Sequence, residues 1–123
     1  MTKNSSLSGF LGRILITSLA VIVVAYLLPG VSLSGVMSAL LLALVLAVLN
    51  VFVKPLLIFL TLPFTIITLG LFLVVINALI IMLADKLVPG FSVGGFWWAL
   101  LFSIILSLVV SVLEALVRDN NND

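Results

Sequence analysis

The stretch YLLPGVSLSG, residues 26–35, decides the fold because the chain repeats it as KLVPGFSVGG at residues 86–95. Both copies place Pro-Gly, Ser and a final Gly at the same positions, and such turn residues are scarce in a chain with four prolines and eight glycines. A match at a constant offset therefore indicates an internal duplication. Because Pro and Gly end helices, each copy is predicted to be the tight turn of a helical hairpin. The turn residues are Pro29, Gly30 and Gly35 in one copy and Pro89, Gly90 and Gly95 in the other.

The composition indicates a membrane protein. Of the 123 residues, 65% are hydrophobic and 7% are charged, whereas soluble domains carry about 25% charged residues. Residues 14–53, 55–84 and 87–113 contain no charge, and a helix that spans a bilayer needs about 20 apolar residues. Helices are expected because lipid offers no partner to backbone polar groups. The spans are predicted at residues 10–28, 36–53, 65–84 and 96–116.

The predicted fold class is an all-α integral membrane protein with four transmembrane helices, built as two parallel repeats of a helical hairpin. The single membrane domain comprises one repeat at about residues 10–54, a linking segment at 55–64, a second repeat at 65–117 and a polar tail at 118–123. Basic residues favour the cytoplasmic side of a membrane. Four of the five fall on the side of the termini, namely Lys3, Arg13, Lys54 and Arg118. Both termini are therefore predicted to be cytoplasmic.

Small residues recur every fourth position on two of the predicted helices. The stripe consists of Ala39, Ala43 and Ala47 on the second helix and Ala99, Ser103, Ser107 and Ser111 on the fourth. Residues four apart share one helix face, and small residues in lipid let helix backbones approach closely. The stripe predicts either packing within the bundle, or an interface between copies of the chain with a serine-lined polar path.

The segment between the two repeats is rich in helix-breaking and polar residues. Pro55 and Pro63 interrupt it, and Gly70 follows. Thr61 and Thr65 are predicted to satisfy freed backbone carbonyls or to cap the next helix. We expect residues 56–62 to form a short helix at the cytoplasmic interface, and a shallow re-entrant segment is the alternative.

Two amides and two charged groups complete the set of candidate polar positions. Asn77 lies inside the third span and Asn50 near the end of the second, where an amide must find a partner. They are predicted to form an interhelical hydrogen bond, or else to contact a permeant or a lipid headgroup. Lys54 and Glu114 occupy equivalent places in the two repeats, and we hypothesise that they approach each other or snorkel outward. The alternative is two unrelated interfacial charges.

Several classes of function are disfavoured. The chain has no histidine and no cysteine, and its formal charge is +1 without a basic cluster. Asp85 and Glu114 are predicted on opposite sides of the membrane, so they cannot act as an acid–base pair. We therefore expect no catalytic residues, no cofactor, no metal and no nucleic-acid partner. Trp97 and Trp98 follow the second turn and are predicted to form an aromatic belt at the outer interface.

The central stretch LNVFVKPLLIFLTLPFTIITLGLFLVVINALIIMLADKLVPGF, residues 49–91, resembles the small four-span bacterial membrane proteins of the phage holin family, superfamily IV type. The shared pattern consists of Asn50, Lys54-Pro55, Thr61-Leu62-Pro63, Leu69-Gly70, Asn77-Ala78 and Pro89-Gly90. The resemblance implies a four-helix protein of the bacterial inner membrane. Its family name implies holin activity, meaning lesions that release an endolysin, but the resemblance brings no ligand-binding residues.

Three functions remain as alternatives. The first is a structural or envelope-associated role that involves a lipid or a protein partner. The second is a holin-like oligomeric pore or lesion former that associates through the small-residue faces. The third is a small oligomeric channel or transporter that uses the asparagines and threonines. A polar stripe buried within one chain would favour the first, and one that faces a symmetry axis would favour the others.

Overall fold

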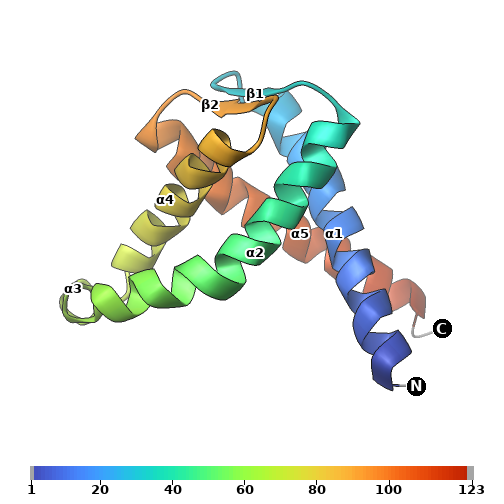
Figure 1. Cartoon of the computed structure of the whole chain (residues 1–123), viewed down its shortest axis with the longest axis horizontal. Helices are drawn as coiled ribbons and strands as arrows, with labels where there is room; N and C mark the ends of the chain where they lie inside the picture. The colour runs from blue at the N-terminus through green and yellow to red at the C-terminus, as the bar shows by residue number, and fades with distance from the viewer. Residues whose placement is uncertain (1, 122–123) are drawn as a thin grey trace.

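The computed structural model describes the backbone of residues 2–121 and the side chains of residues 8–118. This part contains five helices and two short strands, and Figure 1 shows their arrangement. The elements are α1 (Thr2–Leu27), β1 (Val31–Leu33), α2 (Val36–Leu60), α3 (Leu62–Ile67), α4 (Phe72–Leu87), β2 (Phe91–Val93) and α5 (Phe96–Asn121). The chain is therefore mostly helical, as its composition predicts.

Three of the described helices are long and apolar enough to cross a membrane, and the crossing segments are Ser8–Leu27, Val36–Leu60 and Phe96–Arg118. The fourth long helix, α4, has 16 residues. At 1.5 Å per residue it is about 24 Å long, somewhat less than the ~30 Å hydrocarbon core of a bilayer. The protein thus combines three long apolar helices with one shorter helix.

The four long helices pack in a ring. α1 contacts both α2 and α5, and α4 contacts the same two helices from the other side. α2 and α5 therefore lie diagonally opposite each other. Figure 1 shows β1 and β2 at one end of the ring and both chain termini at the other, where α2 diverges from α1 and α5.

The two predicted turns form as expected but also pair with each other, which the sequence did not indicate. α1 ends at Leu27 and α4 at Leu87, just before the two Pro-Gly pairs. β1 and β2 then pair antiparallel, with Ser32 opposite Ser92. Two further bonds extend the ladder, from the Ser34 N–H to the Gly90 carbonyl and from the Gly94 N–H to the Gly30 carbonyl, each 2.8 Å. The turns thus close one end of the bundle together.

The region between α2 and α4 corrects two predictions. α2 passes through Pro55 and ends at Leu60, so residues 56–60 belong to α2 instead of a separate short helix. A proline inside a membrane helix is tolerated because neighbouring groups can compensate for the lost backbone bond. The predicted third span at residues 65–84 is wrong at its start, since α4 begins at Phe72. The chain breaks at Thr61, just before Pro63 as predicted, and again at Leu69 and Gly70, where φ is 57° and 88°.

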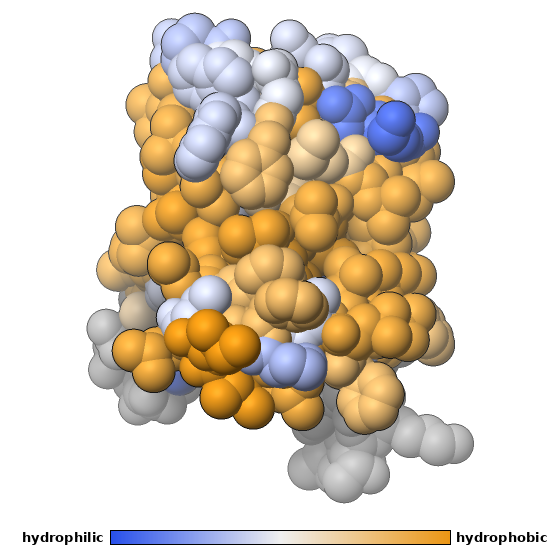
Figure 2. All heavy atoms as spheres, turned by 90° about the vertical axis from the view of Figure 1, so that its left-hand side faces the viewer, coloured by the Kyte–Doolittle hydropathy of each residue, from blue (hydrophilic) through white to orange (hydrophobic). Residues whose placement is uncertain are grey.

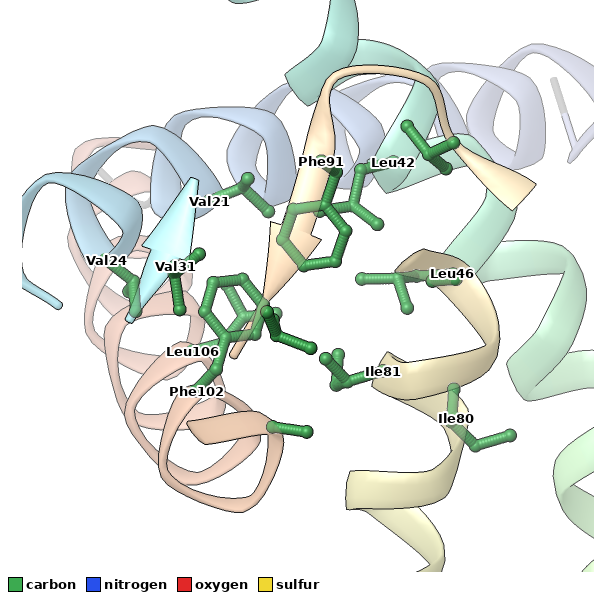
Figure 3. Packing of buried hydrophobic residues seen from close by; sticks show 14 of the residues in the cluster. Val21, Val24, Val31, Leu42, Leu46, Ile80, Ile81, Phe91, Phe102 and Leu106 are labelled. Atoms are coloured by element: carbon green, nitrogen blue, oxygen red, sulfur yellow. The ribbon is translucent and has the colours of Figure 1, made fainter. Parts of the chain in front are cut away.

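The core lies beneath the two strands and is almost wholly apolar. Figure 3 shows Phe91 and Phe102 facing each other beneath β2, with Leu42 and Val21 beside them. The two rings are 5.4 Å apart between centroids, and Phe102 is fully buried. This packed layer separates the strand end of the bundle from the end that holds the termini.

The outer surface has the polarity expected of a membrane protein. Figure 2 shows a broad hydrophobic band beneath a hydrophilic upper end. Large apolar side chains are exposed along the long helices, and α3 has no buried residue. Lipid is the solvent that such a surface requires.

Candidate functional site

The small-residue stripe divides into two parts with different surroundings. Near the strands, its members are buried between helices, and these are Ala39, Ala43, Ala99 and Ser103. The Ser103 hydroxyl donates to the Leu100 carbonyl of its own helix at 2.8 Å. Toward the termini, Ser107 and Ser111 are exposed and Ala47 is half-buried. The stripe therefore packs helices in one half of the bundle and lines an open space in the other half.

That open space is a cleft of about 320 Å³ between α1, α2 and α5. It lies at the end of the bundle where α2 diverges from the other two helices (Figure 1). Its lining consists of Phe10, Arg13, Ile14, Thr17, Ala43, Leu46, Ala47, Asn50, Leu106, Ser107, Val110, Ser111 and Glu114. We call this space the polar cleft.

Polarity changes along the depth of the polar cleft. Its mouth carries Arg13, Asn50 and Glu114, which come from the terminal half of α1, the second half of α2 and the terminal half of α5. One to two helical turns deeper, the lining is uncharged, and small or aliphatic residues such as Ala43 and Leu106 alternate with the hydroxyls of Thr17 and Ser107. A ligand that fits this gradient is charged at one end and uncharged at the other.

An ion pair joins α1 to α5 at the mouth. The Arg13 guanidinium Nη1 donates to the Glu114 carboxylate Oε2 at 2.9 Å, with side-chain exposures of 65% and 25%. The hypothesised approach of Lys54 to Glu114 is therefore wrong. Lys54 lies on α2 and Glu114 on α5, and these two helices are diagonal and diverge at this end. Lys54 is half-buried on α2 and forms no salt bridge with another described side chain.

The predicted asparagine bond is also not present. Asn50 is exposed at the mouth of the polar cleft, whereas Asn77 is half-buried on α4. Within residues 8–118, neither amide side chain forms a hydrogen bond with another residue. The structure therefore brings Asn50 together with the charged pair but leaves Asn77 outside this group.

The threonines of the α2–α4 connection bond to the backbone, as their positions indicate. The Thr61 hydroxyl donates to the Leu57 carbonyl at 2.7 Å, and the Thr65 hydroxyl donates to the Thr61 carbonyl at 3.1 Å. The Thr68 hydroxyl accepts a bond from the Phe72 N–H at 3.1 Å, at the start of α4. These residues, with exposed Pro55 and Pro63 and with Gly70, shape the connection and do not line the polar cleft.

The strand end contains polar contacts that sequence reasoning missed. The Asp85 carboxylate accepts a bond from the Val93 N–H at 3.1 Å and so ties α4 to β2. The Ser38 hydroxyl donates to the Pro89 carbonyl at 3.0 Å. Trp98 is half-buried close above Gly30, so it packs on the turn, whereas Trp97 is 75% exposed. No local pattern signals the Asp85 contact, because Asp85 lies on a helix and its partner belongs to a strand of only three residues.

Comparison of the sequence with known proteins identifies the family of the chain. The chain is 42% identical over 96 residues to an uncharacterized membrane protein, YvlD, of Bacillus subtilis (strain 168), covering 77% of this chain and 81% of that protein. It is 37% identical over 125 residues to the uncharacterized protein SCO3922 of Streptomyces coelicolor, covering 94% of this chain and 100% of that protein. No solved structure matches the chain. Residues 8–112 match the family described as mycobacterial 4 TMS phage holin, superfamily IV, and the chain belongs to that family.

Proposed function

We propose that this protein has a structural, envelope-associated role in the bacterial membrane, and that it works as one packed bundle without opening a hole. The observation that carries the proposal is the course of the polar cleft. It is open at the end with the termini and stops against the apolar core beneath β1 and β2. A space that ends in packed side chains gives no path across the membrane.

The polar groups in the core support this interpretation. Among the described residues, the buried polar side chains are Ser18 and Ser103. Each hydroxyl donates to a carbonyl of its own helix, and the Ser18 bond to Ile14 measures 2.8 Å. Both serines are thus satisfied locally and offer no chain of sites to a permeant.

The outward-facing surface of the bundle also supports a structural role. A pore between copies of the chain would be lined by residues that now face outward. Many of these are large and apolar, such as Leu15 at 63% exposed, Leu108 at 62% and Val112 at 58%. Because water does not wet such a lining well, an assembly of this bundle would need to rearrange before it could conduct.

Inducible expression in a bacterium tests the proposal. At matched membrane levels, cells that make this protein are expected to keep their membrane potential and viability as well as cells that make an unrelated four-span protein. The potential is followed with a voltage-sensitive dye after induction. Abrupt depolarisation, with lysis only when an endolysin is co-expressed, would contradict the structural role and support a holin.

That holin-like lesion former is the second candidate. It is favoured by the description of the family and by the exposure of Ser107 and Ser111 on α5. Those two hydroxyls face the polar cleft of their own chain, so they could line a shared path only after α2 and α5 separate further.

The duplication and the orientation belong to the same proposal. Equivalent bonds support the two-unit origin, since Ser34–Gly90 and Gly94–Gly30 exchange places when the two copies are interchanged. Ser32 pairs with its own equivalent, Ser92, which is the arrangement that a twofold axis along the membrane normal would produce. Both termini then lie on one side, and the excess of basic residues assigns that side to the cytoplasm. An experimental structure in which β1 and β2 were unpaired would contradict this symmetry.

A further inference from the structure

We propose that the polar cleft binds one phospholipid with an anionic phosphate headgroup, with the phosphate at Arg13 and an acyl chain between α2 and α5. The inference rests on the cleft alone and does not depend on whether the protein opens holes. It assigns a ligand class to a space that is otherwise open between three helices.

The first argument is the position of the mouth of the polar cleft relative to the membrane boundary. The part of α5 from Phe96 to Glu114 is about 27 Å long at 1.5 Å per residue, close to the ~30 Å hydrocarbon thickness of a bilayer. When Phe96 lies at one boundary, the Arg13–Glu114 pair therefore lies near the other. This is the level of the phosphate groups of the lipids in that leaflet.

The charge at the mouth is the second argument. Arg13 and Glu114 also border a shallow groove on the other side of the pair, and Arg118 lines that groove with them. Two guanidinium groups thus face one carboxylate among the described side chains. A guanidinium has five N–H donors, and Arg13 uses one nitrogen for Glu114 while its side chain remains 65% exposed. Its other donors are available to phosphate oxygens, which arginine binds well.

The lower polarity of the interior is the third argument. Beyond the mouth, the lining carries no charge and combines small and aliphatic side chains with the hydroxyls of Thr17, Ser107 and Ser111. Ala43 and Ala47 make room where larger residues would fill the space. The volume of about 320 Å³ is at the lower end of the range for ligand sites. It suits one acyl chain better than a whole lipid, so the rest of the molecule would remain in the bilayer. Thr17, Ser107 and Asn50 can bond to the ester region.

Native mass spectrometry of the purified full chain tests the proposal. The protein is titrated with phosphatidylglycerol, and one retained lipid per chain is expected. The double variant R13Q/E114Q removes both charges, so no unpaired carboxylate remains at the half-buried position. It is expected to bind phosphatidylglycerol about tenfold more weakly, as for the loss of one charge-assisted hydrogen bond. K54Q removes a cation at the same membrane end but outside the cleft, and it is expected to bind like the parent.

Two further measurements distinguish binding of a whole lipid from binding of a phosphate group alone. A47L fills the interior of the cleft and leaves the charged pair intact, so it is expected to lose the lipid as well. Inorganic phosphate at the same concentration is expected neither to compete with phosphatidylglycerol nor to raise the melting temperature of the parent. Equal lipid retention by the parent, R13Q/E114Q and A47L, with all three folded by circular dichroism, would overturn the proposal. Competition by inorganic phosphate would also overturn it, because the site would then be an anion site without an acyl component.

Discussion

Replacing Phe102 by alanine is expected to lower the free energy of unfolding by about 3–5 kcal/mol, the range for deleting a buried aromatic ring. Phe102 is fully buried and its ring lies 5.4 Å from that of Phe91. It belongs to the apolar layer that closes the polar cleft toward the strands (Figure 3). Within lipid, packing holds helices together, so a cavity here weakens the contact of α5 with its neighbours.

The matched control is Phe59→Ala, which removes the same ring from a position that is 74% exposed on α2. Its expected effect is within about 0.5 kcal/mol, as for most surface substitutions. Both variants are unfolded by titration with a denaturing detergent and followed by circular dichroism. Equal losses in the two variants would mean that Phe102 faces lipid and that the helix arrangement is wrong.

Replacing Gly90 by alanine is expected to cost about 2–4 kcal/mol. Its φ of 85° is a conformation that residues with a Cβ rarely adopt, and an added Cβ would overlap the hydroxyls of Ser34 and Ser38. These two side chains cannot retreat freely, because Ser38 also donates to the Pro89 carbonyl. The substitution therefore strains the turn and disrupts its contact with Ser34 and Ser38.

Gly35→Ala is the control for this substitution. An added Cβ at Gly35 meets no atom within 4 Å, and its φ of 160° is extended backbone. We expect a change of less than about 1 kcal/mol, toward greater stability, because alanine restricts the unfolded chain. Melting temperatures in the same detergent compare the two. A loss at Gly35 as large as that at Gly90 would show that the turns tolerate no substitution in general and that the paired strands are not the cause.

The helical hairpins could be predicted because their signals are local. Uncharged runs define the spans and the Pro-Gly pairs define the turns, so the ends of α1 and α4 were placed within one to three residues. The pairing of β1 with β2 could not be predicted in the same way. Each strand has three residues, too few to show a period, and its partner lies far along the chain. Only the folded bundle brings the two segments together.

The break between α2 and α4 was misplaced for a different reason. Pro55 and Pro63 suggested it, since proline removes a backbone donor and ends most helices in water. The helix continues through Pro55 and ends at Leu60, just before Pro63, and the chain turns again where Leu69 and Gly70 adopt positive φ. Leu69 gives no local sign of such a conformation, because leucine rarely adopts a positive φ.

The candidate site, too, could be predicted from the sequence only in part. The sequence identified Asn50, Glu114 and the serine stripe as polar positions of interest, and the structure gathers Asn50, Glu114, Ser107 and Ser111 at one cleft while Ser103 is buried between helices. It did not identify Arg13 as the partner of Glu114, because residues 101 positions apart meet only through the contact of α1 with α5. Interhelical partners follow from the ring order of the helices, which periodicity alone does not give.

The measurement that tests the central claim most directly is the side from which the cleft can be reached. The chain has no cysteine, so Ser111→Cys, at the cleft, can be labelled with a membrane-impermeant maleimide, with Val112→Cys as the neighbour at equal depth. A thiol reacts as the thiolate, which requires water.

In inverted vesicles, which expose the cytoplasmic side, we expect rapid labelling at position 111 and slow labelling at position 112. In right-side-out vesicles we expect labelling at neither. Labelling at position 111 from both sides would show a continuous aqueous path and would contradict a cleft that ends within the bundle.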